Sequence, residues 1–158
     1  MARTALDGEI FELASGAGRK ALAAWAADCA ERALPFFERR SPDDCRPREA
    51  IAGIREWVRT GVFHMADVRG KSLAAHAAAR SVDGAARSAA RAAGQAMASA
   101  HAPAHAIAAA IYAATAFRDG AIADARVAGR DDACASEDGD RTALRERKWQ
   151  CRRLQRLS

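Results

Sequence analysis

Histidines and a row of polar side chains are the residues of this chain whose types could do chemistry. His101 and His105 are four positions apart, a spacing that resembles a pair of metal ligands on one helix. His76 could add a third imidazole. Pro103 lies between the first two and predicts a break in the helix, which removes the one-face geometry that a helix-borne ligand pair needs. The dipole of a helix C-terminus favours a protonated imidazole, which is a sufficient structural reason for His101. We therefore expect hydrogen bonds between helices rather than a metal site.

A second polar pattern repeats every four residues within an alanine-rich segment. Its members are Arg87, Arg91, Gln95 and Ser99, and similar pairs on neighbouring segments are His76 with Arg80 and His105 with Tyr112. Residues four apart share a helix face, so the row is either a solvent-exposed face or a charged, imidazole-lined seam between helices. A buried seam would need carboxylate partners, for which Asp28 and Glu31 are candidates.

The sequence contains no catalytic constellation that we can recognise. It has no glycine-rich phosphate loop, no nucleophile elbow, and no cysteine beside a histidine with an orienting partner. The cysteines show no C-x-x-C spacing, which predicts reduced, mostly buried thiols at Cys29, Cys45, Cys134 and Cys151. We expect a protein that is not an enzyme and uses no cofactor.

The elements that position these residues are predicted to be helices because of the alanine content. Alanine supplies 44 of the 158 residues, whereas Leu, Ile, Val and Phe together supply 24. Alanine is the best helix former, and the branched aliphatics that build a sheet are scarce. The length fits one domain. The sequence therefore predicts an all-α fold, a single compact domain of about six antiparallel helices whose alanine faces allow close packing.

Prolines and capping residues divide the chain into predicted elements. An N-terminal extension over 1–18 precedes a domain over 19–158, whose helices are expected at 19–34, 47–60, 64–81, 84–101, 103–118 and 141–156. Pro35 should end the first helix, Pro47 should open the second, and Gly61 should close it in the left-handed conformation. The acidic segment 129–140 is predicted to be an exposed loop. The inward face of the fifth helix should carry Ile107, Ile111, Ala114 and Phe117.

The net charge of +5 is distributed unevenly along the chain. Residues 1–140 carry 18 Lys or Arg against 19 Asp or Glu, whereas residues 141–158 carry seven basic residues and one acidic residue. This basic segment, with Trp149, could contact nucleic acid or an acidic partner. It could instead be a helix that closes the domain, with Trp149 docked and its arginines in solvent, and we favour this interpretation.

The sequence shows no pattern typical of a membrane span or a secretion signal. Arg, His, Gln and Pro interrupt the alanine-rich stretch 73–117, so no segment approaches about 20 uninterrupted apolar residues. The N-terminal sequence MARTALDGEIFEL places acidic residues where a signal peptide needs an apolar segment. We expect a cytoplasmic protein without a membrane partner.

Several motifs occur in an order that resembles a known family. Between Ala21 and Gln150 the chain contains, in sequence, WAADCAE, RPREAI, AAHAAAR, AHxxxHA and ERKWQ. In this order they resemble the immunity proteins of bacterial polymorphic toxin systems, in the group called immunity-five-like. The resemblance implies an all-α protein that binds and neutralises a toxin protein and so protects the producing cell.

The resemblance also implies a set of binding residues. The matching positions are Trp25, Asp28, Glu31, Asp43, Arg46, Arg48, Trp57, His76, Arg80, Arg91, His101 and His105. Gln95 joins this set at a position where a histidine would be expected, which weakens the argument for a metal site.

Three hypotheses about function follow. The leading one is a non-enzymatic immunity protein that occludes its toxin by non-covalent binding. The alternative is a helical nucleic-acid-binding or regulatory module that acts through the basic C-terminal helix. The third is a metal-dependent enzyme using His76, His101 and His105. Alanine faces can pack within one chain or between two, so a homo-oligomer is also compatible with the sequence.

Overall fold

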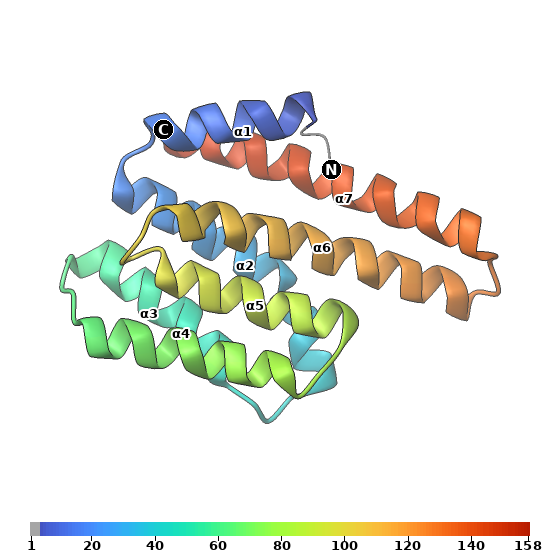
Figure 1. The fold of residues 1–158 in the computed structure, drawn as a ribbon, viewed down its shortest axis with the longest axis horizontal. Coiled ribbons are helices and arrows are strands. Elements are labelled where there is room, and N and C mark those ends of the chain that lie inside the picture. The colour runs from blue at the N-terminus through green and yellow to red at the C-terminus, as the bar shows by residue number, and fades with distance from the viewer. Residues whose placement is uncertain (1–3) are drawn as a thin grey trace.

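Seven helices make up most of residues 4–158, the range that the computed structural model describes, and no strand occurs in this range. The helices are α1 (Ala5–Gly16), α2 (Arg19–Arg40), α3 (Arg46–Thr60), α4 (Met65–Arg80), α5 (Gly84–Ala98), α6 (Ala104–Val127) and α7 (Asp132–Leu157) (Figure 1). The predicted all-α fold is confirmed, and about six expected helices are close to the seven observed.

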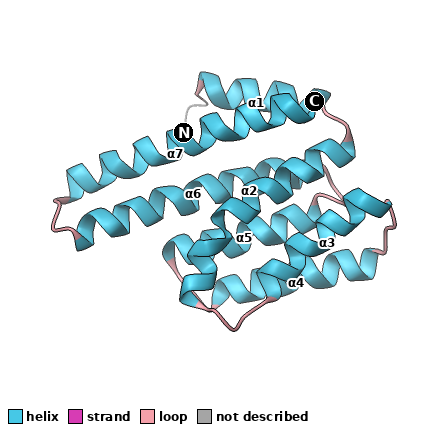
Figure 2. Ribbon diagram, turned by 180° about the vertical axis from the view of Figure 1, so that it is seen from behind, coloured by secondary structure: helices cyan, strands magenta, loops and turns pink. Residues whose placement is uncertain are grey.

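The helices α2, α5 and α6 form the centre of the bundle. They pack against one another, α3 and α4 cover one side, and α7 covers the other side through its contacts with α6 and α2 (Figure 2). The first helix, α1, packs against α7. The predicted N-terminal extension therefore contains a helix that is part of the same bundle.

Alanine faces allow the central helices to approach closely. On α5, Ala89, Ala92, Ala93 and Ala96 are fully buried, and α6 meets them with its own buried alanines. Methyl groups fill little space, so neighbouring helix axes can lie at the short end of the usual ~8–10 Å range. Larger side chains such as Trp25, Phe37 and Leu154 complete the core.

The second predicted helix begins and ends as its sequence indicates. Pro47 lies in the first turn of α3, where its missing N–H has no intrahelical partner to lose. Gly61 follows the helix with φ of 72°, the left-handed conformation that glycine adopts without a steric penalty.

The prediction that Pro35 ends the first helix is wrong, because α2 continues to Arg40. A proline inside a helix costs about 3 kcal/mol. Beyond it, Phe37 is fully buried and Phe36 meets Phe117 edge-on at 5.2 Å between ring centroids. Fully burying a phenylalanine side chain contributes about 1.5–3 kcal/mol, so the buried Phe37, together with the partly buried Phe36, offsets the cost of Pro35.

The acidic segment is also helical rather than an exposed loop, since α7 begins at Asp132. Asp131 caps this helix by accepting a hydrogen bond from the backbone N–H of Cys134 at 2.8 Å. Ala135 and Gly139, four residues apart, are buried. Acidic residues near a helix N-terminus are stabilised by the helix dipole, so the composition that suggested a loop suits this position.

The helix α6, which corresponds to the fifth predicted helix at 103–118, differs from its prediction in two ways. It extends to Val127, nine residues past the expected end, and Ile111 is 50% exposed instead of facing inward. By length and mean hydropathy, α6 alone among the described helices would meet the requirement for a membrane span. It lies between α2, α5 and α7 here, and core helices of globular domains meet the same requirement.

Candidate functional site

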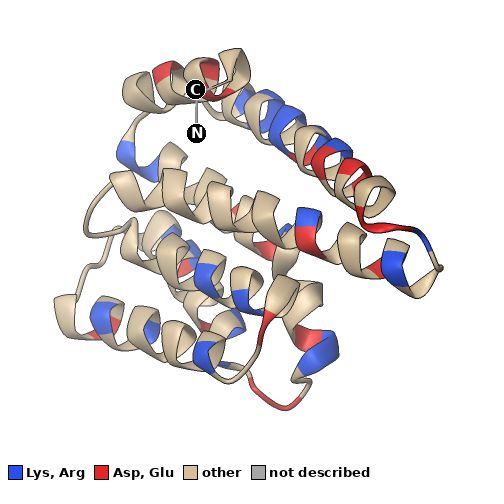
Figure 3. Ribbon diagram, turned by 45° about the vertical axis from the view of Figure 1, so that its right-hand side comes forward, with Lys and Arg blue, Asp and Glu red and all other residues tan. Residues whose placement is uncertain are grey.

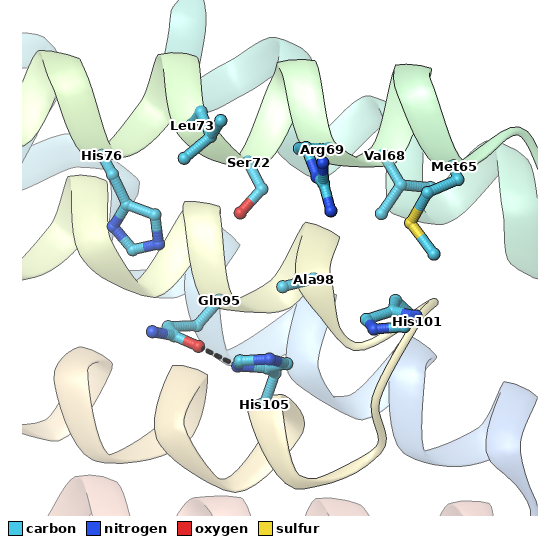
Figure 4. A pocket seen from close by; sticks show the side chains of 10 residues that line it. All are labelled: Met65, Val68, Arg69, Ser72, Leu73, His76, Gln95, Ala98, His101 and His105. Carbon is cyan, nitrogen blue, oxygen red and sulfur yellow. Dashed lines mark hydrogen bonds between the residues drawn. The ribbon is translucent and has the colours of Figure 1, made fainter.

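A pocket between α4, the end of α5 and the start of α6 gathers four of the residues expected to form a site. Its volume is about 190 Å³. The polar side chains that line it are Arg69, Ser72, His76, Gln95, His101 and His105 (Figure 4). The remaining lining residues are apolar, and no carboxylate is among them. We call this the histidine pocket.

The ring of His76 lies directly on the backbone of α5. A Cβ atom at Gly94 would fall 2.8 Å from His76 Nε2, so the absence of a side chain at Gly94 is what makes room for the imidazole. Ser72 Oγ donates a hydrogen bond of 2.9 Å to the Gly94 carbonyl and holds α4 against α5 at the same level. The glycine and the serine together fix the position of His76.

The electrostatic environment keeps His76 neutral near pH 7. Burial lowers the pKa of His76, because desolvation disfavours the charged imidazole. Electrostatic interactions with Arg91, His105 and Arg80 lower this pKa further. A neutral imidazole can both donate and accept a hydrogen bond.

Gln95 acts as the partner of His105. Its Oε1 lies 2.6 Å from His105 Nδ1. An amide oxygen only accepts hydrogen bonds, so Nδ1 of His105 carries the proton of this hydrogen bond. With Arg69 as a donor, the pocket offers groups that can bind a polar side chain or small polar molecule.

The three histidines do not form a metal-ligand set. They line one pocket, but within residues 4–158 no group of three His, Cys, Asp or Glu side chains is placed to hold a metal ion. The third hypothesis, a metal-dependent enzyme, therefore has no ligand geometry to support it.

The polar row on α5, from Arg87 to Ser99, faces solvent at its first residue and lies between helices at its last. Arg87 is exposed and donates to the Val82 carbonyl at 2.8 Å, whereas Arg91 is half-buried, with its guanidinium 5.8 Å from the Tyr112 ring centroid. Ser99, at the far end, is buried. Arg80 is exposed at the end of α4. The two interpretations of the row thus apply to different parts of it.

Asp28 and Glu31 do not supply the carboxylates of this seam, so that expectation is wrong. Asp28 accepts from Arg55 of α3 at 3.0 Å and from Arg153 of α7 at 2.7 Å. Glu31 also pairs with Arg55. The two acids lie on a face of α2 that meets α3 and α7, and the histidine pocket lies beside α4.

The other expected site residues are structural or lie elsewhere on the surface. Trp25 is fully buried, and its Nε1 donates to the Gln150 carbonyl at 2.9 Å. Trp57 is buried, with Arg19 over its ring at 5.8 Å. The turn between α2 and α3 carries the exposed Asp43.

Arg46 and Arg48 follow that turn in the first turn of α3. Arg46 pairs with Asp44 and Arg48 pairs with Glu38, each at 2.6 Å. None of the residues of this turn lines the histidine pocket.

The residue patterns did not reveal a polar network on α7. Glu146 is buried and accepts two hydrogen bonds from Arg32 Nε and a third, at 2.9 Å, from Nη2. Gln150 is buried and donates to the Ala110 carbonyl at 2.9 Å. Glu146, Gln150 and Leu154 are four residues apart and therefore share one face of the helix. Because leucine is usually buried, this spacing is the signal in the sequence that could have predicted burial of Glu146 and Gln150.

The cysteines are free thiols. Cys29 and Cys151 are buried, Cys134 is half-buried and Cys45 is exposed. Half of them therefore agree with the expectation of buried thiols.

The fold and the pocket together define an all-helical scaffold whose polar side chains join helices to one another. A family model described as "Imm-5 like putative immunity protein" matches residues 12–157. The chain belongs to this family, as the order of its motifs indicated. Neither a curated protein nor a solved structure matches the chain.

Proposed function

We propose that this protein neutralises a toxin protein by binding it non-covalently and covering the surface through which the toxin acts. The family match over residues 12–157 carries the proposal, because an immunity protein has a toxin as its partner. We place this action in the cytoplasm of the producing cell, and we expect it to need neither catalysis nor a cofactor.

The way in which the helices are joined supports a binding role. Trp25, Gln150 and Ala110 connect α2, α7 and α6 through buried hydrogen bonds, and Asp28 connects α2 with α3 and α7 through ion pairs. A surface that is already ordered loses little conformational entropy when a partner binds, which favours affinity.

Co-expression with the toxin-domain protein encoded at the neighbouring locus tests this proposal. We expect growth to be rescued and the two proteins to copurify as a stoichiometric complex. Toxin released from the complex by denaturant and refolded should regain its activity, since nothing covalent has changed. An unrelated toxin serves as the specificity control. Absence of both rescue and copurification would overturn the proposal.

A further inference from the structure

The basic residues of α7 fall into two groups. Arg147 and Arg153 turn toward the body of the protein. Arg147 pairs with Asp7 of α1 at 2.6 Å, and Arg153 pairs with Asp28 of α2 at 2.7 Å. Both charges are compensated within the fold, and both residues serve to attach α7 to its neighbours.

The other basic residues form an exposed row that we call the α7 stripe. It consists of Arg141, Arg145, Lys148, Arg152 and Arg156, all of them exposed. Steps of four, three, four and four residues keep them within about 80° of the helix circumference and spread them over roughly 22 Å of its length. The blue segments along α7 in Figure 3 show this concentration of positive charge.

Most of the charge on the α7 stripe has no partner in the protein. Arg141 pairs with Asp138 at 3.4 Å, and Arg145 donates to Thr142 Oγ1 at 3.3 Å. Lys148, Arg152 and Arg156 form no ion pair with any residue in the described range 4–158. The stripe therefore presents four uncompensated cations to solvent.

An aromatic platform adjoins the α7 stripe. The guanidinium of Arg32 lies 4.1 Å from the Trp149 ring centroid, and the hydrogen bonds to Glu146 hold it there. A cavity of about 470 Å³ opens beside this stack, with Phe117 and three stripe residues in its lining. Stacked arginine and aromatic side chains are enriched at the centres of protein interfaces.

We propose that the α7 stripe and this cavity form the surface that holds the toxin, and that the facing surface of the toxin is rich in carboxylates. The inference rests on the proposed function, which supplies the toxin as partner. Charge complementarity identifies the occupant, because uncompensated cations attract an acidic surface and repel a basic one. The platform adds a planar aromatic contact beside the charges, since the Arg32 side chain is exposed and Trp149 is half-buried, and such a contact fits a folded protein surface.

The test compares two charge-reversed variants of the full-length protein. The first is Arg145→Glu/Lys148→Glu/Arg152→Glu, in the α7 stripe. The matched control is Lys20→Glu/Arg40→Glu/Arg59→Glu, which changes the net charge equally at exposed positions of α2 and α3. Binding to the purified toxin domain is measured at low and high salt.

We expect the stripe variant to lose on the order of 100-fold in association rate at low salt, and its rate to depend less on salt than that of the wild type. The control should bind as the wild type does. Equal binding by the wild type and the stripe variant overturns this inference alone, while a wild type that does not bind the toxin overturns the proposed function as well.

Two further measurements complete the experiment: binding of each protein to duplex DNA or RNA, and thermal unfolding as a control for folding. If the stripe variant binds the toxin fully but loses affinity for duplex DNA or RNA, the stripe serves nucleic acid and the inference is overturned. Thermal unfolding midpoints should be the same for the three proteins, since the replaced side chains are exposed. If the stripe variant is unstable, Arg145→Gln/Lys148→Gln/Arg152→Gln takes its place, with the same expected direction.

Discussion

At the scale of single residues, His76 shows how the fold changes the chemistry of a side chain. Its pKa lies below the ordinary value of 6.5 because it is half-buried and faces Arg80 on α4, Arg91 on α5 and His105 on α6. The neighbouring Gln95 is uncharged, and no carboxylate lines the pocket. The environment thus penalises the imidazolium without compensating it.

This environment predicts a pH-dependent stability. A histidine with a lower pKa in the folded state binds more protons when unfolded, so its contribution is complete above about pH 6.5 and is lost as the pH falls toward the folded pKa. As the pH is lowered from about 7.5 to 5, the free energy of unfolding, measured by urea denaturation, should fall less steeply in His76→Gln than in the wild type. His64→Gln, at an exposed position, should keep the wild-type dependence. Identical profiles for all three proteins would contradict the prediction.

At the scale of elements, the contact between α6 and α7 depends on a glycine in the segment that resembled a loop. A Cβ atom at Gly139 would lie 2.6 Å from Ile122 Cγ1 and 3.1 Å from the Arg118 carbonyl oxygen. The backbone at Arg118 cannot easily move, so a methyl group would push the two helices apart.

Two glycine substitutions should therefore change stability in opposite directions. Gly139→Ala should lower the free energy of unfolding by about 1–3 kcal/mol, because the contact becomes overpacked. Gly70→Ala, inside α4 with nothing near its Cβ position, should raise it by about 0.5–1 kcal/mol through helix propensity. Chemical denaturation of both variants checks this, and a Gly139→Ala protein at least as stable as the wild type would show that the α6–α7 contact is looser than the structure indicates.

At the scale of the whole molecule, the basic C-terminal segment is a structural part of the domain rather than an attached tail. Leu154 is fully buried, Gln150 receives the Trp25 hydrogen bond, and Arg147 holds α1. These contacts use faces of α7 other than the exposed stripe, so one helix both closes the domain and presents charge.

Removing residues 141–158 should consequently unfold the domain. The truncated protein should lose its cooperative thermal transition in circular dichroism, since the core contacts of Trp25 and Ala110 lose their partner. The stripe variant, which keeps these contacts, should retain a cooperative transition. A truncated protein that melts as sharply as the full chain would mean that the segment is dispensable to the fold.

The sequence by itself determined the all-α class, the family and several helix ends, because these depend on local properties. Alanine favours helices wherever it occurs, Gly61 adopts a positive φ, and the order of motifs is visible along the chain. The histidine pocket was anticipated in part, since His76, Gln95 and His105 belong to one set of polar residues in alanine-rich segments.

Only the tertiary structure decided which of these residues meet. It carries α2 past Pro35, converts the acidic segment into the start of α7, and pairs Asp28 with Arg55 and Arg153 instead of with a histidine. The net charge shows the same division. Composition located the basic excess in the last 18 residues, whereas packing determined which cations are compensated by distant acids and which remain available to a partner. These ion pairs join residues far apart in the sequence and depend on how the helices are oriented in the fold. Local helix propensity does not determine that orientation.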